Sequence, residues 1–476
     1  MGSSCGRLLS SMLMRSILNR SLLMFVLWQP GVARAQDNSA LIASTPDRLA
    51  AFIRIDTTNP PGNESAAVDF LANILKAEGI AFETGESAPG RGNLWARIKG
   101  GREPALILLN HTDVVPADAT RWRQPPLSGA VVDGQVWGRG ALDMKSIGIV
   151  QLQAFIALHR SGRTPNRDVL FVATADEEAG GAFGAGWLVR EHPELFRKGA
   201  FLLNEGGAGA RYAKATPVIS IETTQKVPLW LRLRVDGPPS HGAVPRVETA
   251  VTRLVRALAR LDGYSFAPRV LPVVQQYATG VADLQTSELV PRFKDLASSI
   301  KDPEFMLALQ IAQPGMQAAL RNTCSMTRLG ASDKINVVPT NAWAELDCRL
   351  LPDQSPTAFI EELRTLMNEP RLNIDTILSF TPAESSTSTL LYEQMKRTMT
   401  REFPDALVLP RLSVGFTDSH FFRDIGIQAY GFAPFVMDAN AYGAGEGAHG
   451  NNERISVENL TRGARLMIEL VDEFTR

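Results

Sequence analysis

Residues 105–113 read ALILLNHTD, a short apolar run that ends in a histidine and an aspartate. Two further stretches have the same form: residues 169–178 read VLFVATADEE, and residues 200–207 read AFLLNEGG. Unbroken apolar runs of this length, bounded by polar residues or glycine, are typical of strands that are covered on both faces of a parallel sheet. The three stretches therefore predict a mainly parallel sheet inside an α/β domain.

The sequence around these runs predicts how the sheet is covered and interrupted. Residues 146–158 are apolar with a helical character, and they would form the right-handed crossover that parallel strands need. Residues 229–235 (LWLRLRV) and 341–348 alternate apolar and polar side chains, as strands with one wet face do. We expect an open antiparallel sheet with helices on one face over residues 227–380. Further helices are predicted at residues 66–77, 250–261, 281–320, 357–367, 390–403 and 457–474.

The length and charge of the chain limit its organisation and partners. A chain of 476 residues is too long for one compact core, so two domains are expected. We assign residues 36–226 and 381–476 to a catalytic domain, and residues 227–380 to a smaller α+β domain inserted into it. The formal net charge of -1, without a Lys/Arg-rich stretch that carries aromatic residues, argues against nucleic acid as a partner.

Residues 1–35 have the form of an export signal. Arginines precede the apolar run at residues 22–28 (LLMFVLW), and residues 33–35 (ARA) place small side chains where a signal peptidase cleaves. The run is much shorter than the ~20 residues that cross a bilayer, so we expect cleavage near Ala35 and no stable membrane span afterwards. An exported protein, periplasmic or secreted, is therefore predicted. In such a compartment Cys324 and Cys348 either pair or remain as buried thiols.

Acidic and imidazole side chains follow all three predicted strands. His111 follows the first strand, Glu177 and Glu178 the second, and Glu205 the third. The carboxyl ends of parallel strands meet at one edge of an open sheet, where ligands bind. A further carboxylate, Asp143, lies in a glycine-rich turn (GRGALDMK) before the crossover helix. So many carboxylates would repel one another unless cations hold them.

The residue types at this edge indicate a metal centre. Imidazole and carboxylate ligands without thiolate suit zinc, with cobalt or manganese as alternatives. Two ions need a bridging carboxylate, and one acid must stay free to take a proton from water. The adjacent Glu177 and Glu178 supply a base and a ligand. Taken singly, these residues also have structural explanations, since Asp143 could cap the helix that follows it.

Nine motifs resemble one metallopeptidase family, the family of aminoacylase, acetylornithine deacetylase and Gly-X carboxypeptidase. They run in the family's order over nearly the whole chain after the signal. Residues 122–129 (WRQPPLSG) and the helical stretch at 281–320 look closest to its carboxypeptidase and N-acyl-amino-acid hydrolase branch. The motifs are HTDVVP (111–116), GRGALDMK (138–145), DEEAGG (176–181), EGG (205–207), PPSHGAVP (238–245), NVVP (336–339), DCRLLP (347–352), TDSHFF (417–422) and AHGNNE (448–453).

The resemblance implies a zinc-exopeptidase fold and a site with two zinc ions, which Co2+ or Mn2+ could replace. His111 and Glu205 would bind one ion, and Glu178 and His449 the other. Asp143 would bridge the two ions. A hydroxide held between the ions would attack the amide carbonyl of the substrate.

The resemblance also implies roles for residues that do not bind metal. Glu177 would be the general base, and Asp113 would orient the imidazole of His111. His241 would stabilise the oxyanion, in this family often from a partner subunit, although a turn residue is an alternative reading. Arg349 would hold the substrate carboxylate, unless it pairs with an acidic neighbour. Weaker candidates for substrate contacts are Asn336 and Thr417.

Together these features predict a hydrolase that cleaves an amide bond adjacent to a free carboxylate. Its substrate would be an N-acyl amino acid or a short peptide. The inserted α+β domain would act as a lid and as the dimerisation domain of a homodimer. Two alternatives remain open, an inactive family member that acts as a binding protein and an esterase or carbamate hydrolase on the same metal site.

Overall fold

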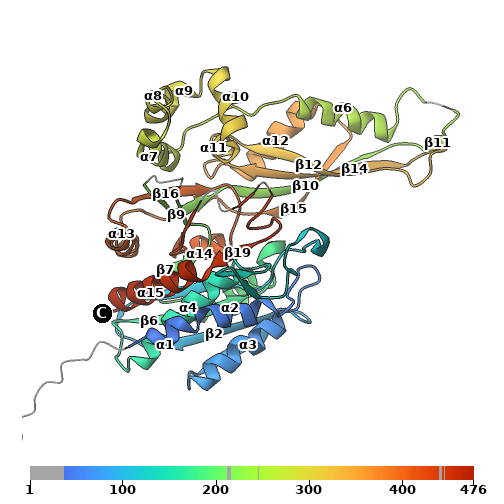
Figure 1. Ribbon diagram of the computed structural model, residues 1–476. Helices are drawn as coiled ribbons and strands as arrows, with labels where there is room; N and C mark the ends of the chain where they lie inside the picture. The colour runs from blue at the N-terminus through green and yellow to red at the C-terminus, as the bar shows by residue number, and fades with distance from the viewer. Residues whose placement is uncertain (1–36, 212–215, 245, 439–441, 444) are drawn as a thin grey trace, which may run out of the picture. The chain divides into compact units, whose positions relative to one another are not determined.

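The computed structural model describes residues 37–211, 216–244, 246–438, 442–443 and 445–476 (Figure 1). The predicted export signal at residues 1–35 lies outside the described residues. Every helix and strand below belongs to one compact unit, Asn38–Arg476. Among the described residues, no helix has the length and apolar character that a membrane crossing needs.

A large, mainly parallel sheet forms the centre of this unit. Its strands are β1 (Phe82–Glu86), β2 (Gly92–Ile98), β3 (Glu103–His111), β6 (Arg167–Thr174), β7 (Gly199–Asn204), β8 (Gly209–Arg211), β9 (Val218–Gln225), β16 (Leu407–Ser413), β17 (Gln428–Gly431) and β18 (Val436–Asp438). They lie in the order β1-β2-β6-β3-β7-β17-β9-β8-β18, and β16 pairs with β9. The central strands β6, β3, β7 and β17 are parallel to one another, which confirms the sheet predicted from the three apolar runs.

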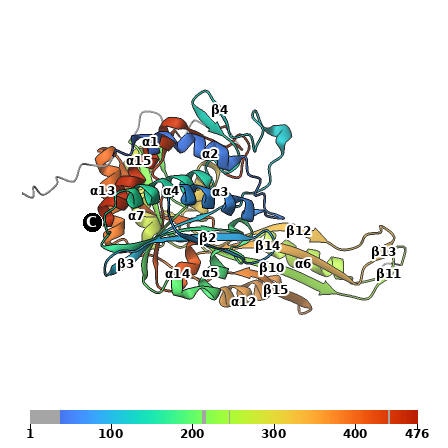
Figure 2. The same cartoon turned by 90° about the horizontal axis from the view of Figure 1, so that it is seen from below.

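Helices cover both faces of this sheet, and this explains why its strands are apolar throughout (Figures 1 and 2). Leu106 and Leu108 of β3 point into a core shared with the helices α4 and α15. Ile107 and Leu109 point to the opposite face, where they join side chains of α5 and α14. The helices around the sheet are α1 (Ser39–Ala43), α2 (Thr45–Ile53), α3 (Glu64–Ala77), α4 (Lys145–Arg160), α5 (Ala185–Glu191), α13 (Leu390–Glu402), α14 (Ser419–Asp424) and α15 (Val457–Phe474).

A second sheet is antiparallel, with the order β12-β14-β10-β15, and it carries helices on one face as the alternating pattern predicts. Side chains of β10 alternate between buried and exposed from Leu231 to Asp236. Cys324 and Cys348 lie opposite each other on neighbouring strands and form a disulfide. The elements of this part are β10 (Val227–Asp236), β12 (Thr323–Gly330), β14 (Asn341–Leu350), β15 (Leu372–Ser379), α6 (Ala250–Asp262) and α12 (Pro356–Met367).

The predicted helical stretch at residues 281–320 is present, but it begins earlier and is divided into short helices. Three of these helices start at a proline, where the missing backbone N–H costs no hydrogen bond. Among the described residues, their buried apolar side chains do not belong to the core of the antiparallel sheet. Instead they share a core with Val218 of β9 and Leu412 of β16. The helices are α7 (Pro272–Val281), α8 (Val290–Lys294), α9 (Leu296–Ser299), α10 (Pro303–Ala312) and α11 (Pro314–Ala318).

Candidate metal centre

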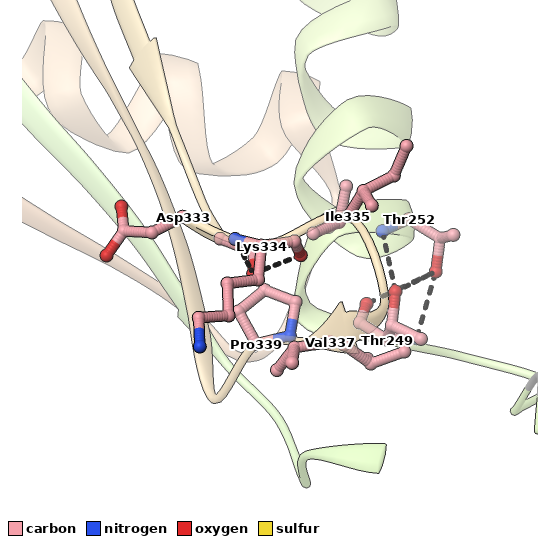
Figure 3. A pocket seen from close by; sticks show the side chains of 10 residues that line it. Thr249, Thr252, Asp333, Lys334, Ile335, Val337 and Pro339 are labelled. Carbon is pink, nitrogen blue, oxygen red and sulfur yellow. Dashed lines mark hydrogen bonds between the residues drawn. The ribbon is translucent and has the colours of Figure 1, made fainter. Parts of the chain in front are cut away.

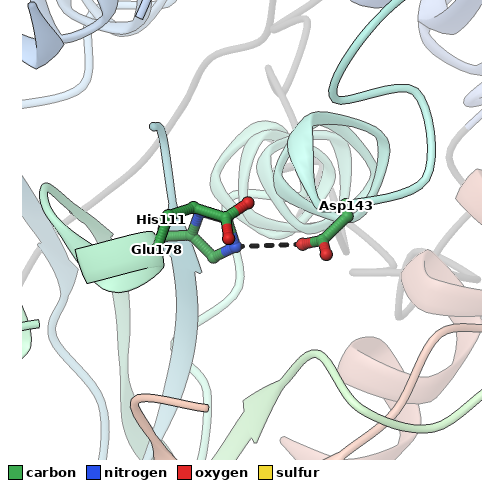
Figure 4. Close-up of side chains that lie close together, drawn as sticks. All are labelled: His111, Asp143 and Glu178. Carbon is green, nitrogen blue, oxygen red and sulfur yellow. Dashed lines mark hydrogen bonds and ion pairs between the residues drawn. The ribbon is translucent and has the colours of Figure 1, made fainter. Parts of the chain in front are cut away.

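The predicted metal ligands come together at the carboxyl edge of the parallel sheet. His111 is the last residue of β3, and Glu205 directly follows β7. Glu177 and Glu178 begin a short 3₁₀ helix, η2 (Glu177–Ala179), behind the end of β6. Asp143 lies just before α4, and Figure 4 shows its carboxylate directed at the ring of His111. The parallel strands thus bring these side chains to one edge of the sheet, as the sequence predicts.

The two oxygens of Asp143 face two different imidazoles. Oδ1 lies 3.2 Å from Nε2 of His111, which is also 3.5 Å from Oε1 of Glu205. Oδ2 lies 3.1 Å from Nε2 of His449, which is also 3.1 Å from Oε2 of Glu178. Two sets of one imidazole and one glutamate therefore meet at a single aspartate, as expected for a carboxylate that bridges two cations.

The loop that carries His449 reaches this centre from the far end of the sequence. It precedes β19 (Arg454–Ser456), which forms a small sheet with β5 (Gln135–Trp137) and β4 (Ala130–Val132). His449 has a φ of 58°, a left-handed backbone that residues with a side chain rarely adopt. Such conformations cluster at functional sites, where the surrounding structure holds them.

The hydrogen bonds of His111 leave one ring nitrogen for a cation. Its Nδ1 lies 3.1 Å from the backbone oxygen of Asp113 and 3.3 Å from Oδ1 of the same residue. An Nδ1–H donated to Asp113 leaves a lone pair on Nε2, the atom that faces the carboxylates of Asp143 and Glu205. Lone pairs so placed repel unless a proton or a metal ion lies between them.

The charges of the cluster also fit a metal ion. Burial and the neighbouring Asp143 raise the pKa of Glu205 to about 8. Burial and the same kind of repulsion raise the pKa of Glu177 well above its ordinary value. In addition, Oε1 of Glu177 and Oε1 of Glu178 are buried without a hydrogen-bond partner among the described residues. Divalent cations would relieve this repulsion and satisfy these oxygens, so the donor set fits the group that the sequence implies.

Asp113 organises two parts of the centre at once. Besides facing His111, its Oδ1 accepts a hydrogen bond from the backbone N–H of Glu177 at 3.1 Å. Its Oδ2 accepts from the backbone N–H of Glu178 at 3.1 Å and from Nδ2 of Asn59 at 2.8 Å. Since Asp113 is fully buried, these bonds do not compete with water. An aspartate held in this way would orient the imidazole of His111, the role that the resemblance implies.

We predict that Asp113→Asn weakens metal binding by about 10–100-fold, the usual effect of removing a partner behind a metal-binding histidine. An amide has only one accepting oxygen, so it cannot bind both backbone N–H groups and the His111 ring. Equilibrium dialysis against zinc measures the affinity, and Asp375→Asn on the exposed face of β15 is the matched control. Unchanged zinc affinity in the Asp113 variant would contradict this role.

The sequence analysis assigned no role to Glu453, but its side chain connects two segments of the site. Its Oε2 accepts from Nη1 of Arg139 at 2.6 Å, and both side chains are buried. Its Oε1 accepts from the backbone N–H groups of Leu142 at 2.6 Å and Asp143 at 3.1 Å. Nη2 of Arg139 in turn donates to the backbone oxygen of Gly450 at 2.8 Å. The pair therefore ties the turn of Asp143 to the loop of His449.

Glu453→Gln is expected to lower the free energy of unfolding by about 3–5 kcal/mol, because it leaves the guanidinium of Arg139 buried without a counter-charge. Urea unfolding measures this change. The double variant Arg139→Met/Glu453→Leu removes both charges and should recover part of the lost stability. A single variant as stable as the unsubstituted protein would argue against a buried ion pair at this place.

His241 and Asn336 lie away from the metal cluster. His241 belongs to β11 (Ser240–His241), which pairs with β13 (Val337–Val338) beyond the antiparallel sheet (Figures 1 and 2). Its side chain is exposed, and Nδ1 accepts from the backbone N–H of Ala243 at 3.1 Å. Asn336 stands in the chain between Ile335 and Val337, which line a pocket of about 500 Å³ (Figure 3). Among the described residues, neither His241 nor Asn336 is hydrogen-bonded to a residue of the cluster.

The polar groups of Arg349 and Thr417 are hydrogen-bonded, in part or fully, to neighbouring residues. Nε and Nη2 of Arg349 donate to Asp347 at 2.7 and 3.1 Å, so the ion pair that the sequence left open is formed. Trp230 donates to the same carboxylate at 3.0 Å. Nη1 of Arg349, however, has no hydrogen-bond partner among the described residues. Thr417 is buried and bonds to Gln225 through its hydroxyl at 3.0 Å.

Comparison with known sequences agrees with the motifs. Residues 107–473 match the peptidase family M20/M25/M40. The N-fatty-acyl-amino acid synthase/hydrolase of Xenopus tropicalis is 31% identical over 445 residues, which cover 89% of this chain and 85% of that protein. Aminoacylase-1 of Sus scrofa is 27% identical over 427 residues, which cover 88% and 92%. The probable carboxypeptidase S-like 2 of Dictyostelium discoideum is 27% identical over 375 residues, which cover 77% and 70%.

Solved structures with low sequence identity share the fold. An M20 family metallo-carboxypeptidase from Sulfolobus solfataricus superposes with a TM-score of 0.70 at 19% identity, and covers 90% of this chain and 98% of its own. A dipeptidase from Saccharomyces cerevisiae gives a TM-score of 0.67 at 14% identity, with 92% and 98% covered. The resemblance inferred from the motifs is thus confirmed. The chain belongs to the peptidase family M20/M25/M40 and is an enzyme of the metallopeptidase and amidohydrolase type.

Proposed function

We propose that the enzyme uses two divalent metal ions to hydrolyse an amide bond next to a free carboxylate, in an N-acyl amino acid or a short peptide. The observation that carries this proposal is the pair of imidazoles that face the two oxygens of Asp143, with the unbonded oxygen of Glu177 beside them. The substrate class is supported by two relatives named as an N-fatty-acyl-amino acid synthase/hydrolase and an aminoacylase.

The ligand sets follow the two halves of the cluster. His111 and Glu205 would hold one ion, Glu178 and His449 the other, and Asp143 both. The absence of thiolate among these ligands favours zinc, with Co2+ or Mn2+ as replacements. When bound, such a pair of cations lowers the pKa of water and polarises the carbonyl of the substrate.

Glu177 is suited to move a proton during the reaction. Its Oε2 lies 3.9 Å from Nε2 of His111, farther than the nearest oxygens of Asp143 and Glu205. Its backbone is held by Asp113 while Oε1 stays free of hydrogen bonds within the described chain. We therefore assign Glu177 as the general base that takes the proton of the attacking water and donates it to the leaving amine.

Further residues would recognise the substrate and the developing charge. Nη1 of Arg349 is buried without a hydrogen-bond partner within the described chain, and it would bind the substrate carboxylate, while Thr417 would add a polar contact. Asn336 accepts a hydrogen bond from the residue after His241, so it would contact substrate in the same site as His241. His241 is exposed and lies apart from the cluster, so we place it in the site of the partner subunit of a homodimer, where it would stabilise the oxyanion. Residues 227–380 would then be the lid and dimerisation domain. We also propose that the enzyme is exported after cleavage near Ala35.

A hydrolysis screen tests the proposed reaction. It compares N-acyl amino acids and dipeptides with N-acyl amines that lack the carboxylate, and with the matched esters and carbamates, each with added zinc, cobalt or manganese. We expect kcat/KM to be at least about tenfold higher with the carboxylate, because a charged hydrogen bond contributes about 1.5–3 kcal/mol. Binding without turnover would favour a binding protein, and cleavage of esters or carbamates alone would favour the other alternative.

A further inference from the structure

A second pocket, of about 560 Å³, lies between the helices that follow α6 and the strands β9 and β16. Figure 1 shows these helices, α7 to α11, above the two strands. The pocket has the size of a small-molecule site, and none of its lining residues belongs to the proposed metal centre. Apolar side chains make up most of its wall, among them Val218, Val274, Val281, Leu284, Met316 and Leu412.

Among the polar side chains of this pocket, one cationic group has no anionic partner within the described chain. Arg411 is the only charged side chain among the lining residues that the structure describes. Its guanidinium lies 6.0 Å from the centre of the Tyr277 ring, and no described carboxylate forms an ion pair with it. Two glutamines are satisfied within the chain, since Gln313 donates to Gln285 at 3.1 Å and Gln285 donates to the backbone oxygen of Val281 at 3.2 Å.

We propose that this pocket binds a linear aliphatic carboxylate, with its carboxylate on Arg411 and its alkyl chain along the apolar wall. One free cation at the side of an apolar cavity matches a ligand with a single anionic end. A peptide would bring several amide groups against a wall that is mostly apolar, which is unfavourable. The site is separate in its residues from the metal centre, so it goes beyond the amide hydrolysis proposed above.

Gly315 gives a direct way to block the pocket. It lines the pocket on α11, and a Cβ at this position would meet no atom within 4 Å. A Cβ therefore fits at this position without displacing the backbone or a neighbouring side chain. Gly315→Trp should fill the pocket, while Arg411→Gln should remove only its charge.

Isothermal titration of the full chain with octanoate, dodecanoate and 1-dodecanol tests the proposal. We expect one dodecanoate per chain, with affinity rising about fourfold per added methylene, which corresponds to about 0.8 kcal/mol. Arg411→Gln should weaken dodecanoate at least about tenfold and leave dodecanol unchanged, and Gly315→Trp should abolish both. Arg371→Gln, at an exposed arginine that does not line the pocket, is the control and should bind as the unsubstituted protein does.

Two results would overturn the proposal. The first is undiminished dodecanoate affinity in both Arg411→Gln and Gly315→Trp. The second is loss of all dodecanoate binding when metal ions are removed, because that would place the ligand at the metal centre. Amide hydrolysis by Gly315→Trp at the unsubstituted rate shows that this variant is folded.

Discussion

Glu177→Gln should lower kcat for amide hydrolysis by about 10²–10⁴-fold while the bound metal stays unchanged. Glutamine keeps the shape of the side chain but cannot take a proton from water. Because Oε2 of Glu177 is the most distant of the three carboxylate oxygens around Nε2 of His111, we expect no loss of a ligand. Steady-state kinetics and elemental analysis of the same sample measure both quantities, and Glu177→Ala should behave alike.

Glu178→Gln distinguishes the role of the proposed base, Glu177, from the role of its neighbour. This substitution weakens a ligand of the second ion, so metal content and activity should fall together. The exposed Glu191→Gln is a control that should change neither. A Glu177→Gln enzyme that keeps more than a tenth of its kcat, or that loses metal as Glu178→Gln does, would assign the base elsewhere.

Removal of the metal ions by a chelator should lower activity at least about 10³-fold, and added zinc, cobalt or manganese should restore it. Zinc affinity should also rise with pH. Without metal, burial raises the pKa of Glu205 to about 8, and hydrogen bonds to Asp143 and Glu178 raise the pKa of His449 to about 10. Protons therefore occupy both ligands at neutral pH and compete with the ions. Proton release during a zinc titration should therefore be positive at pH 7, decline above about pH 8 as Glu205 loses its proton, and decline further towards pH 10 as His449 does.

Full turnover by the metal-free protein would contradict the assignment of this reaction to a metal centre. Zinc binding without proton release at pH 7 would contradict the protonated states of Glu205 and His449. The matched control is Glu83, a surface glutamate of β1, whose substitution by glutamine should leave the number of released protons unchanged.

The sheet and much of the site could be predicted because they depend on local patterns. An unbroken apolar run such as residues 105–109 marks a buried strand, and parallel strands bring their carboxyl ends to one edge. His111, Glu177 and Glu205 could be placed together on this basis alone. The position of His449 came from the family motif, since a glycine-rich loop has no pattern that fixes where it lies.

The sequence patterns did not predict the contacts between distant segments. Arg139 and Glu453 are 314 residues apart, and nothing in either motif indicates that the two side chains meet. Apolar spacing predicted the helices from residue 281 onward but not the sheet that they cover, because an apolar helix face fits more than one partner. Pairing of Cys324 with Cys348 likewise depends on the register of β12 and β14, which puts them opposite each other.

Crystals grown with zinc and measured on both sides of its absorption edge test the central assignment most directly. The anomalous map should contain one peak bounded by His111, Glu205 and Asp143, and a second bounded by His449, Glu178 and Asp143. A map without these peaks, or with zinc bound only at other places, would contradict the proposed centre.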